Sequence, residues 1–209
     1  MAVDDPPLKT RRWTRTEYER LVDQGVFRED ERLELLDGLL VVREPQGSRH
    51  SAAVAALCEI LARAFGAGYH VRPQLPVALD DMSEPEPDVV VVRGGPWDYV
   101  TSHPSAPVLV VEIAETSLAV DLAHKGGLYA RAGIADYWIV NLPDGVLKIY
   151  REPAPSTTAR SGAEYRASSA SHRARPSLRS ARPPRASPSP ACWRRRSAGG
   201  NGIAKPTAA

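Results

Sequence analysis

The chain has 209 residues, enough for one domain with its own hydrophobic core, and only two cysteines, which cannot form a disulfide framework. No apolar run reaches the roughly 18 residues of a membrane span and no signal-peptide segment opens the sequence, so we expect a cytoplasmic protein. Residues 1–150 carry 15 Lys/Arg against 23 Asp/Glu, a net charge of −8, whereas residues 151–209 carry 12 against 2, a net charge of +10.

The N-terminal region predicts a short helix followed by a β-hairpin. Residues 1–12 are polar and contain two prolines, so we expect a mobile N-terminus there. Thr14 and Glu17 have the spacing of a capping box, which predicts that a helix begins at this point. Two apolar runs over residues 32–43 are joined by Asp37-Gly38, the dipeptide that a type I′ turn favours, and they therefore predict a hairpin.

The middle of the chain predicts one long helix and three strands. Apolar residues at helical spacing indicate a helix over 49–65. An extended segment follows over 69–79, and its two prolines suit an edge strand. Runs of β-branched residues indicate buried strands over 88–92 and 108–113. The 15 residues between them, 93–107, form a long loop of the kind that often carries function.

The region after residue 113 predicts a helical crossover between two parallel strands. Thr116 or Ser117 can cap a helix that runs to about residue 132, and the apolar run over 136–141 predicts the next strand. Strands joined by such a crossover lie parallel. A last strand over 146–150 follows a turn.

The composition changes from residue 152 onward, where the chain has no valine or phenylalanine and is dominated by Arg, Ser, Pro and Ala. Such a sequence cannot bury enough apolar surface to offset the entropy lost on ordering, so residues 152–209 are predicted to be disordered. The folded domain is then predicted over residues 13–151. Two origins of the tail remain open: a basic arm that binds nucleic acid, or an out-of-frame reading of a GC-rich gene.

Two carboxylates are predicted to meet at one end of the sheet. Asp88 begins one buried strand and Glu112 lies near the end of the next, so antiparallel pairing brings them side by side. Alternation along both strands places the two side chains on the same face. Buried carboxylates need partners, and hard oxygen ligands of this kind suit Mg²⁺ or Mn²⁺, with water and substrate phosphate completing the coordination shell.

The predicted crossover helix carries Asp121, Lys125 and Tyr129 at intervals of four residues, so all three share one helix face. A lysine in this place can stabilise charge on a phosphate as the transition state forms. The alternative is an exposed Asp–Lys pair, which contributes only about 0.3–0.5 kcal/mol. In the long loop, Trp97 and Tyr99 are candidates for nucleic-acid contact, with anchoring of the loop as the alternative.

Several short motifs follow one another in a fixed order. They are Leu33-Glu34-Leu35-Leu36-Asp37-Gly38, the helix opening at Ser48 and His50, Glu86-Pro87-Asp88, Glu112-Ile113-Ala114, the series Asp121, Lys125 and Tyr129, Tyr129-Ala130-Arg131-Ala132-Gly133, and Asp136-Tyr137-Trp138-Ile139-Val140. This set resembles the Uma family of restriction endonucleases, part of the PD-(D/E)XK nuclease superfamily. The resemblance covers residues 13–150 and none of the tail.

The resemblance implies an α/β fold with a mixed sheet, in which a restriction-endonuclease-like αβββαβ core follows a helix and a β-hairpin. It implies that Asp88 and Glu112 are metal ligands and that the main-chain carbonyl of Ile113 is a third. The superfamily's usual lysine, two residues after the acid, is replaced by Ala114, and a lysine on the following helix stands in for it. The other implied site residues are Lys125 in that role, Glu34 as a supporting acid, Asp121 and Tyr129 as supporting residues, and His50, whose alternative role is packing at a helix start.

Two functions of different classes follow. The first is a Mg²⁺-dependent (or Mn²⁺-dependent) endonuclease that hydrolyses DNA, with a homodimer left open. The second is a non-catalytic nuclease-fold module that binds nucleic acid or a partner protein. The acidic body favours neither DNA affinity nor fast encounter. A chain truncated by a frame error is a third reading. Metal binding followed by cleavage separates the first two.

Overall fold

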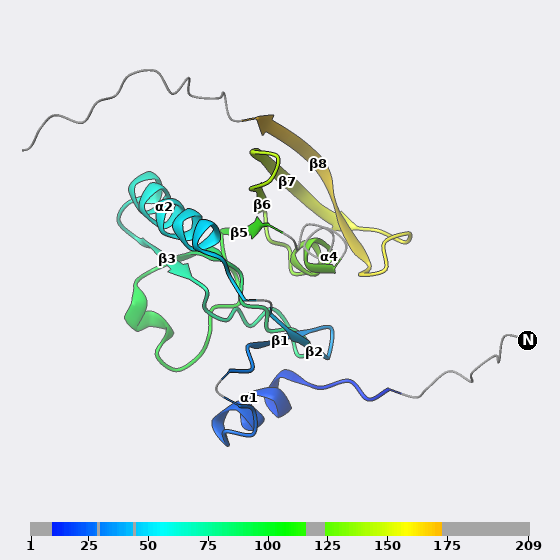
Figure 1. Ribbon diagram of the computed structural model, residues 1–209. Coiled ribbons are helices and arrows are strands. Elements are labelled where there is room, and N and C mark those ends of the chain that lie inside the picture. Colours follow the sequence, from blue (N-terminus) through cyan, green and yellow to red (C-terminus); the bar gives the residue numbers. More distant parts are fainter. Residues whose placement is uncertain (1–9, 29, 44, 116–123, 173–209) are drawn as a thin grey trace, which may run out of the picture. The chain divides into compact units, whose positions relative to one another are not determined.

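The computed structural model describes residues 10–28, 30–43, 45–115 and 124–172. The chain divides into two units, Met1–Ala174 and Arg175–Ala209, and every described residue belongs to the first unit. This unit holds a large mixed sheet and a separate hairpin, together with the helices that Figure 1 labels. None of the helices in the described ranges is long and apolar enough to span a membrane.

Six strands form the large sheet in the order β3-β4-β5-β6-β7-β8. Neighbouring strands are antiparallel except for β5 and β6, which are parallel, as the predicted crossover requires. The mixed α/β fold class is therefore confirmed. The strands are β3 Tyr69–Pro73, β4 Val89–Arg93, β5 Leu109–Ala114, β6 Asp136–Asn141, β7 Val146–Pro155 and β8 Ala163–His172.

A small hairpin, β1 (Leu33–Leu36) and β2 (Leu39–Val42), forms the second sheet. Its turn residues Asp37 and Gly38 have φ angles of 49° and 76°, the left-handed values that a type I′ turn needs. Gly38 is also required by space, because a Cβ there would lie 2.6 Å from the side chain of Arg12. A bridge between Leu35 and Glu84 docks the hairpin on the segment that leads into β4.

Helix α2 (Ser48–Phe65) covers one face of the large sheet. Its buried residues Val54 and Leu61 pack on alternate residues of β4 and β5, beginning with Val89 and Val111. Upstream, helix α1 (Arg15–Asp23) begins with the capping box that Thr14 and Glu17 predict. The loop after β4 contains a short 3₁₀-helix, η1 (Pro96–Tyr99).

Helix α4 (Gly126–Arg131) lies on the other face of the sheet. Tyr129 packs there with Val90 and Val110, and Tyr137 of β6 joins the same cluster. The predicted helix ended near residue 132, and the structure agrees, because Gly133 leaves the helix with φ 72°. The predicted beginning lies within residues 116–123, outside the described residues.

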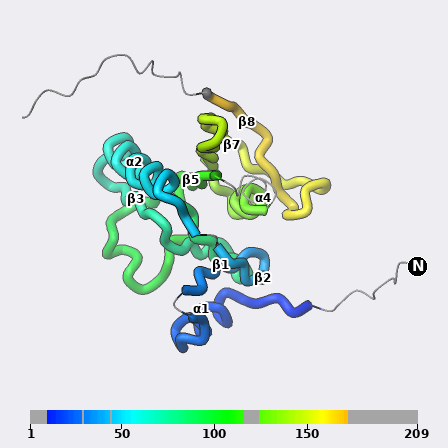
Figure 2. Tube along the Cα trace, viewed as in Figure 1, coloured from blue at the N-terminus to red at the C-terminus, as the bar shows by residue number. Residues whose placement is uncertain are grey.

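The structure departs from the expectation of disorder beyond residue 151. Strand β7 continues to Pro155, and β8 pairs with it along its whole length (Figure 2). Composition predicts only how much side chain can be buried, whereas β8 is held by backbone hydrogen bonds to β7, by one buried residue and by one partly buried tyrosine. Ala163 is 6% exposed, and the ring of Tyr165 stacks 5.9 Å from that of Tyr137. The rest of the predicted tail, 173–209, lies outside the described residues.

Candidate active site

The strands β4 and β5 stop pairing at Val89 and Val111, and two carboxylates lie where the ladder would continue. The main-chain N–H of Ile113 donates to Asp88 Oδ2 at 2.8 Å. The N–H of Asp88 lies 3.4 Å from Glu112 Oε2. Each carboxylate thus takes the backbone donor of the neighbouring strand, and Asp88 and Glu112 lie side by side and almost fully buried.

Glu112 is held by two side chains from the α4 region. Lys125 Nζ lies 3.2 Å from Glu112 Oε1, and the Tyr129 hydroxyl donates to the same oxygen at 2.7 Å. Burial in this place raises the pKa of Tyr129 well above its ordinary value, so the hydroxyl remains a donor. Lys125 is only 6% exposed, which rules out the exposed-pair alternative for it. Asp121 lies outside the described residues.

Asp88 is held by side chains from the start of α2. His50 Nε2 lies 3.0 Å from Asp88 Oδ2, and Gln46 Nε2 donates to Oδ1 at 3.3 Å. Burial alone would raise the pKa of Asp88, but the hydrogen bonds from His50 and the Ile113 N–H outweigh it, and the pKa is lowered. The same bond raises the pKa of His50. His50 therefore contacts the predicted site rather than only packing at the helix start.

The β1–β2 hairpin brings two further charged side chains to the same place. Glu34 Oε1 lies 3.1 Å from Lys125 Nζ, and its Oε2 accepts the N–H of Glu86 at 3.1 Å. Arg43 Nη1 donates to Glu86 Oε2 at 2.6 Å, and its Nη2 lies 3.6 Å from Asp88 Oδ1. Lys125 thus lies between the carboxylates of Glu34 and Glu112.

The acidic cluster (Glu34, Glu86, Asp88 and Glu112) contains oxygen ligands of the type that hard divalent cations take. Its four carboxylates face two permanent cations, Lys125 and Arg43, together with His50. No group of three or more His, Cys, Asp or Glu side chains in the described ranges is arranged to hold a metal ion. The adjacent carboxylates of Asp88 and Glu112 fit Mg²⁺ in donor type, since this ion usually keeps several waters and takes only one or two carboxylates.

Comparisons with known proteins give the family and the fold of the chain. The family model described as "Uma2: Putative restriction endonuclease" matches residues 15–178. The chain belongs to the Uma2 family. The resemblance carried by the sequence motifs is therefore confirmed, and the matched range extends through β8.

One solved structure places the Uma2 chain in a nuclease fold. The chain is similar to the crystal structure titled as a putative nuclease belonging to DUF820 from Anabaena variabilis ATCC 29413. The two chains are 16% identical with a TM-score of 0.50, and the match covers 68% of this chain and 81% of that one. No curated protein matches the chain.

The aromatic residues of the long loop are not part of the Uma2 acidic cluster. Trp97 and Tyr99 lie beyond the last residue of β4, whereas Asp88 lies before its first residue. The length of β4, at about 3.3 Å per residue, therefore separates the two aromatic residues from Asp88. Trp97 is 83% exposed. Tyr99 packs beneath the guanidinium of Arg72 and donates to the carbonyl of Arg93, which are the contacts of a loop anchor.

Sequence reasoning assigned no role to Glu86 of the acidic cluster, nor to Arg43 and Gln46, which contact the cluster. Glu86 belongs to the Glu86-Pro87-Asp88 motif, but the motif assigns no role to its side chain. Arg43 reads as a charged residue that ends an apolar strand. Only the docking of the hairpin through the Leu35–Glu84 bridge brings it to Glu86, and no local pattern encodes that contact.

Proposed function

We propose that this chain is a metal-dependent endonuclease that hydrolyses DNA phosphodiester bonds. The observation that carries the proposal is the pair of buried carboxylates, Asp88 and Glu112, with Lys125 3.2 Å from Glu112. Membership in a family described as putative restriction endonucleases supports the reaction class, and the fold is similar to that of a protein described as a putative nuclease.

The residues that would hold Mg²⁺ or Mn²⁺ are Asp88, Glu112 and the main chain of Ile113. When bound, the ion polarises a phosphoryl oxygen and lowers the pKa of an attacking water. The Ile113 N–H fixes the Asp88 carboxylate, and Tyr129 fixes that of Glu112. Rigid orientation of this kind holds ligands in productive geometry without reorganisation during the reaction.

Lys125 supplies positive charge to the reacting phosphate, with Glu34 and Glu112 orienting its ammonium group. His50 plays the matching part for Asp88, since its imidazole holds one carboxylate oxygen in place. Glu34 also accepts the N–H of Glu86 and thereby ties the hairpin to the start of β4. All of these groups are buried, so their interactions act in a medium of low dielectric constant.

A non-catalytic nuclease-fold module is the second candidate, and one observation favours it. Both oxygens of Asp88 already accept hydrogen bonds from protein donors, which are Gln46, His50 and Ile113. A metal ion therefore competes with donors that already satisfy the carboxylate. In that case the fold would bind nucleic acid or a protein partner without cleavage.

Calorimetry with Mn²⁺ and cleavage of supercoiled plasmid separate the two candidates. We expect the wild-type chain to bind Mn²⁺ and to nick DNA, and Asp88→Asn and Glu112→Gln to lose both activities. Glu59→Gln, at an exposed position of α2, is the matched control and should keep both. Equal Mn²⁺ affinity in all four proteins would contradict the metal site, and binding without nicking would favour the non-catalytic module.

A further inference from the structure

Arg43 reaches the acidic cluster with more hydrogen-bond donors than the cluster uses. Its side chain is 8% exposed, and Nη1 donates to Glu86. The 3.6 Å between Nη2 and Asp88 Oδ1 is too long for a hydrogen bond. A guanidinium has five N–H donors in a planar fork. Most of those in Arg43 therefore have no acceptor within the described part of the chain.

Asp88 does not depend on Arg43, because both of its oxygens have closer donors. Oδ2 accepts from Ile113 and His50, and Oδ1 from Gln46. Glu86 takes a hydrogen bond from one side of the guanidinium fork, and Asp88 faces the other side at 3.6 Å without a hydrogen bond. The remaining donors are thus available to an anion from outside the chain.

The acidic cluster is most open to solvent at Glu86, the carboxylate that Arg43 contacts, whereas the side chains of Arg43 and Lys125 are equally buried. The side chain of Glu86 is 24% exposed, compared with 3% for Glu112 and 8% for Lys125. An entering ligand therefore meets Glu86, which is hydrogen-bonded to Arg43, before Asp88 and Glu112. His50 provides a second unpaired polar atom beside Asp88, since its Nδ1 is buried without a hydrogen-bond partner among the described residues.

We propose that Arg43 binds a non-bridging oxygen of the nucleic-acid backbone phosphate that lies next to Asp88. This inference rests on the proposed function, because it uses the same acidic cluster. A bidentate guanidinium contact offsets the repulsion between the phosphate and the carboxylates and fixes the orientation of the phosphate. Arg43 then acts on the substrate beside Glu86 and Asp88, and Lys125 acts beside Glu34 and Glu112.

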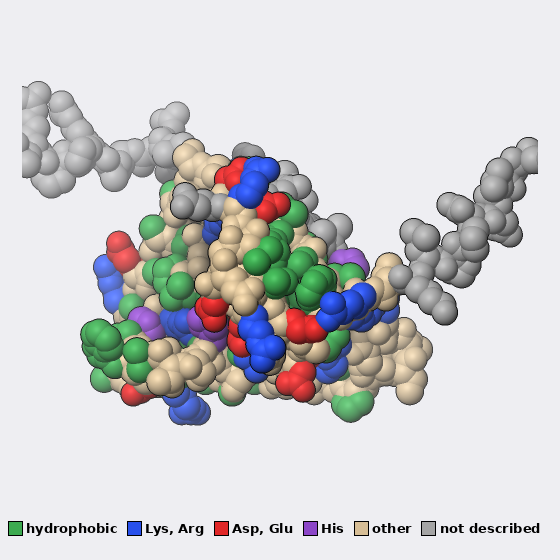
Figure 3. Space-filling view, turned by 90° about the horizontal axis from the view of Figure 1, so that it is seen from below, with side chains coloured by type: hydrophobic (Ala, Val, Ile, Leu, Met, Phe, Trp, Pro, Cys, Tyr) green, Lys and Arg blue, Asp and Glu red, His purple; other side chains and the backbone are tan. Residues whose placement is uncertain are grey.

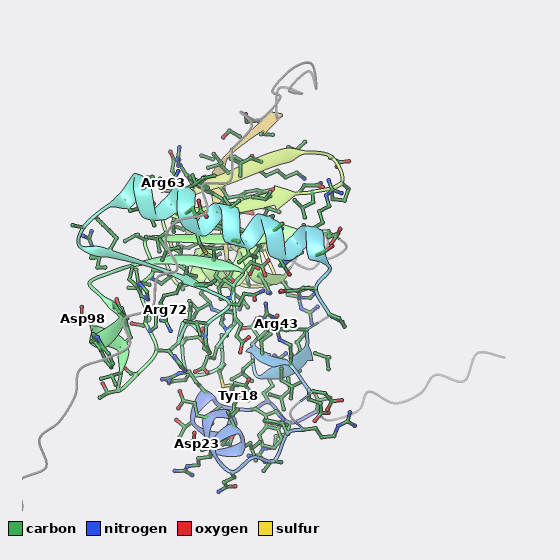
Figure 4. All side chains as sticks on the ribbon, turned by 60° about the vertical axis from the view of Figure 1, so that its left-hand side comes forward. Tyr18, Asp23, Arg43, Arg63, Arg72 and Asp98 are labelled. Carbon is green, nitrogen blue, oxygen red and sulfur yellow. The ribbon has the colours of Figure 1, made fainter. Side chains whose placement is uncertain are left out.

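The salt dependence of DNA binding tests this contact. The affinity of a labelled duplex is measured in EDTA, where cleavage does not interfere, for wild type, Arg43→Gln and Arg63→Gln. Loss of one phosphate contact should reduce the slope of log K against log salt by about 0.9. We expect that reduction for Arg43→Gln only. Arg63 pairs with Glu59 on α2, and Figure 4 shows it on the outer side of the helix, away from Arg43.

Arg43→Lys keeps the charge but loses the fork, so it should keep the wild-type slope and lower the cleavage rate in Mn²⁺ at least tenfold. If Arg43→Gln does not fold, Arg43→Lys still tests the phosphate contact, because an unchanged cleavage rate in Arg43→Lys would overturn that contact. Melting curves check folding, and Mn²⁺ calorimetry on each variant measures the metal site separately.

An unchanged slope in Arg43→Gln with weaker Mn²⁺ binding would overturn the phosphate contact, because Arg43 would then serve Asp88. No measurable DNA affinity in the wild-type chain would overturn it as well. A wild-type chain that shows the Arg43-dependent slope but never cleaves would contradict the endonuclease and leave the phosphate contact standing. The two proposals therefore fail in different ways.

Discussion

The two faces of the β4–β5 pair differ in what they bury. The face under α2 is apolar along its length, from Val89 and Val91 to Val111 and Ile113. The opposite face begins with valines, but it ends in the carboxylates of Asp88 and Glu112 with their cationic partners. Two sets of alternating residues on the same strands thus serve different purposes. One face supplies hydrophobic burial, and the other places charges where β4 and β5 no longer pair with each other.

The largest effect is expected from Lys125→Met, which removes the cation between Glu34 and Glu112. Loss of charge stabilisation should lower the cleavage rate by about 10²-fold or more. The unpaired buried carboxylates should also cost about 3–5 kcal/mol of stability without metal. Plasmid nicking and thermal melting measure the two effects.

The double variant Glu34→Gln with Lys125→Met is the control, because it removes one repelling carboxylate together with the cation. It should regain most of the melting temperature but none of the cleavage. Full cleavage by Lys125→Met alone would show that Lys125 does not take part in the chemistry.

The α2 face is expected to respond in stability alone. Leu61 is 3% exposed in the cluster between α2 and the sheet, so Leu61→Ala should cost about 2–5 kcal/mol through lost burial and a residual cavity. Denaturant unfolding measures this loss. Mn²⁺ affinity, measured well below the melting temperature, should not change. A tenfold weaker affinity would show that the two faces are not independent.

A smaller, pH-dependent effect is expected from Glu84, which lies outside the acidic cluster. Burial, followed by the neighbouring carboxylates of Glu19 and Glu86, raises the pKa of Glu84 to about 7, and Arg15 only partly opposes this. Its Oε2 is buried without a hydrogen-bond partner in the described residues. The folded state therefore holds the proton more tightly than the unfolded state, and stability should fall as pH rises from the ordinary value of 4.5 toward 7. Melting of Glu84→Gln should lack this fall, and an identical pH profile would contradict the assignment.

The smallest effect is expected from Trp97→Ala. Because Trp97 is exposed, its removal should change stability by less than about 0.5 kcal/mol. If the ring stacks on a base, DNA affinity should fall about tenfold, in line with ~1–3 kcal/mol per stacked base. Fluorescence anisotropy with labelled DNA measures this loss. Unchanged affinity would leave the loop without a role in binding.

Local patterns were sufficient to predict much of the fold. The Asp37-Gly38 dipeptide gave the hairpin turn, and Thr14 with Glu17 gave the helix start, because both depend on residues close in sequence. The proximity of Asp88 and Glu112 followed from alternation and antiparallel pairing alone, and their chemical roles remain predictions.

What the sequence did not show depends on contacts between distant segments. Arg43 and Glu86 meet only after the hairpin docks on the chain before β4. The burial of Lys125 likewise depends on Glu34, which lies far away in the sequence. Charged side chains also mix on the face shown in Figure 3, so net charge alone does not locate the site. Strand β8 was missed because most of its side chains are small and polar and give no strand pattern, although its backbone pairs with β7.

The position of β8 has a consequence for how the chain can be shortened. The change in composition after Arg151 suggests that the chain can be shortened there, but the segment beyond Arg151 packs on α4. Gly127 has no room for a Cβ because of Ser161, and Arg131 donates to the Ser161 carbonyl. A chain ending there would make the more apolar β7, rather than the polar β8, the edge of the sheet, and would remove Tyr165 from the ring of Tyr137. Unprotected edges of this kind pair with other chains, so the shortened protein should self-associate.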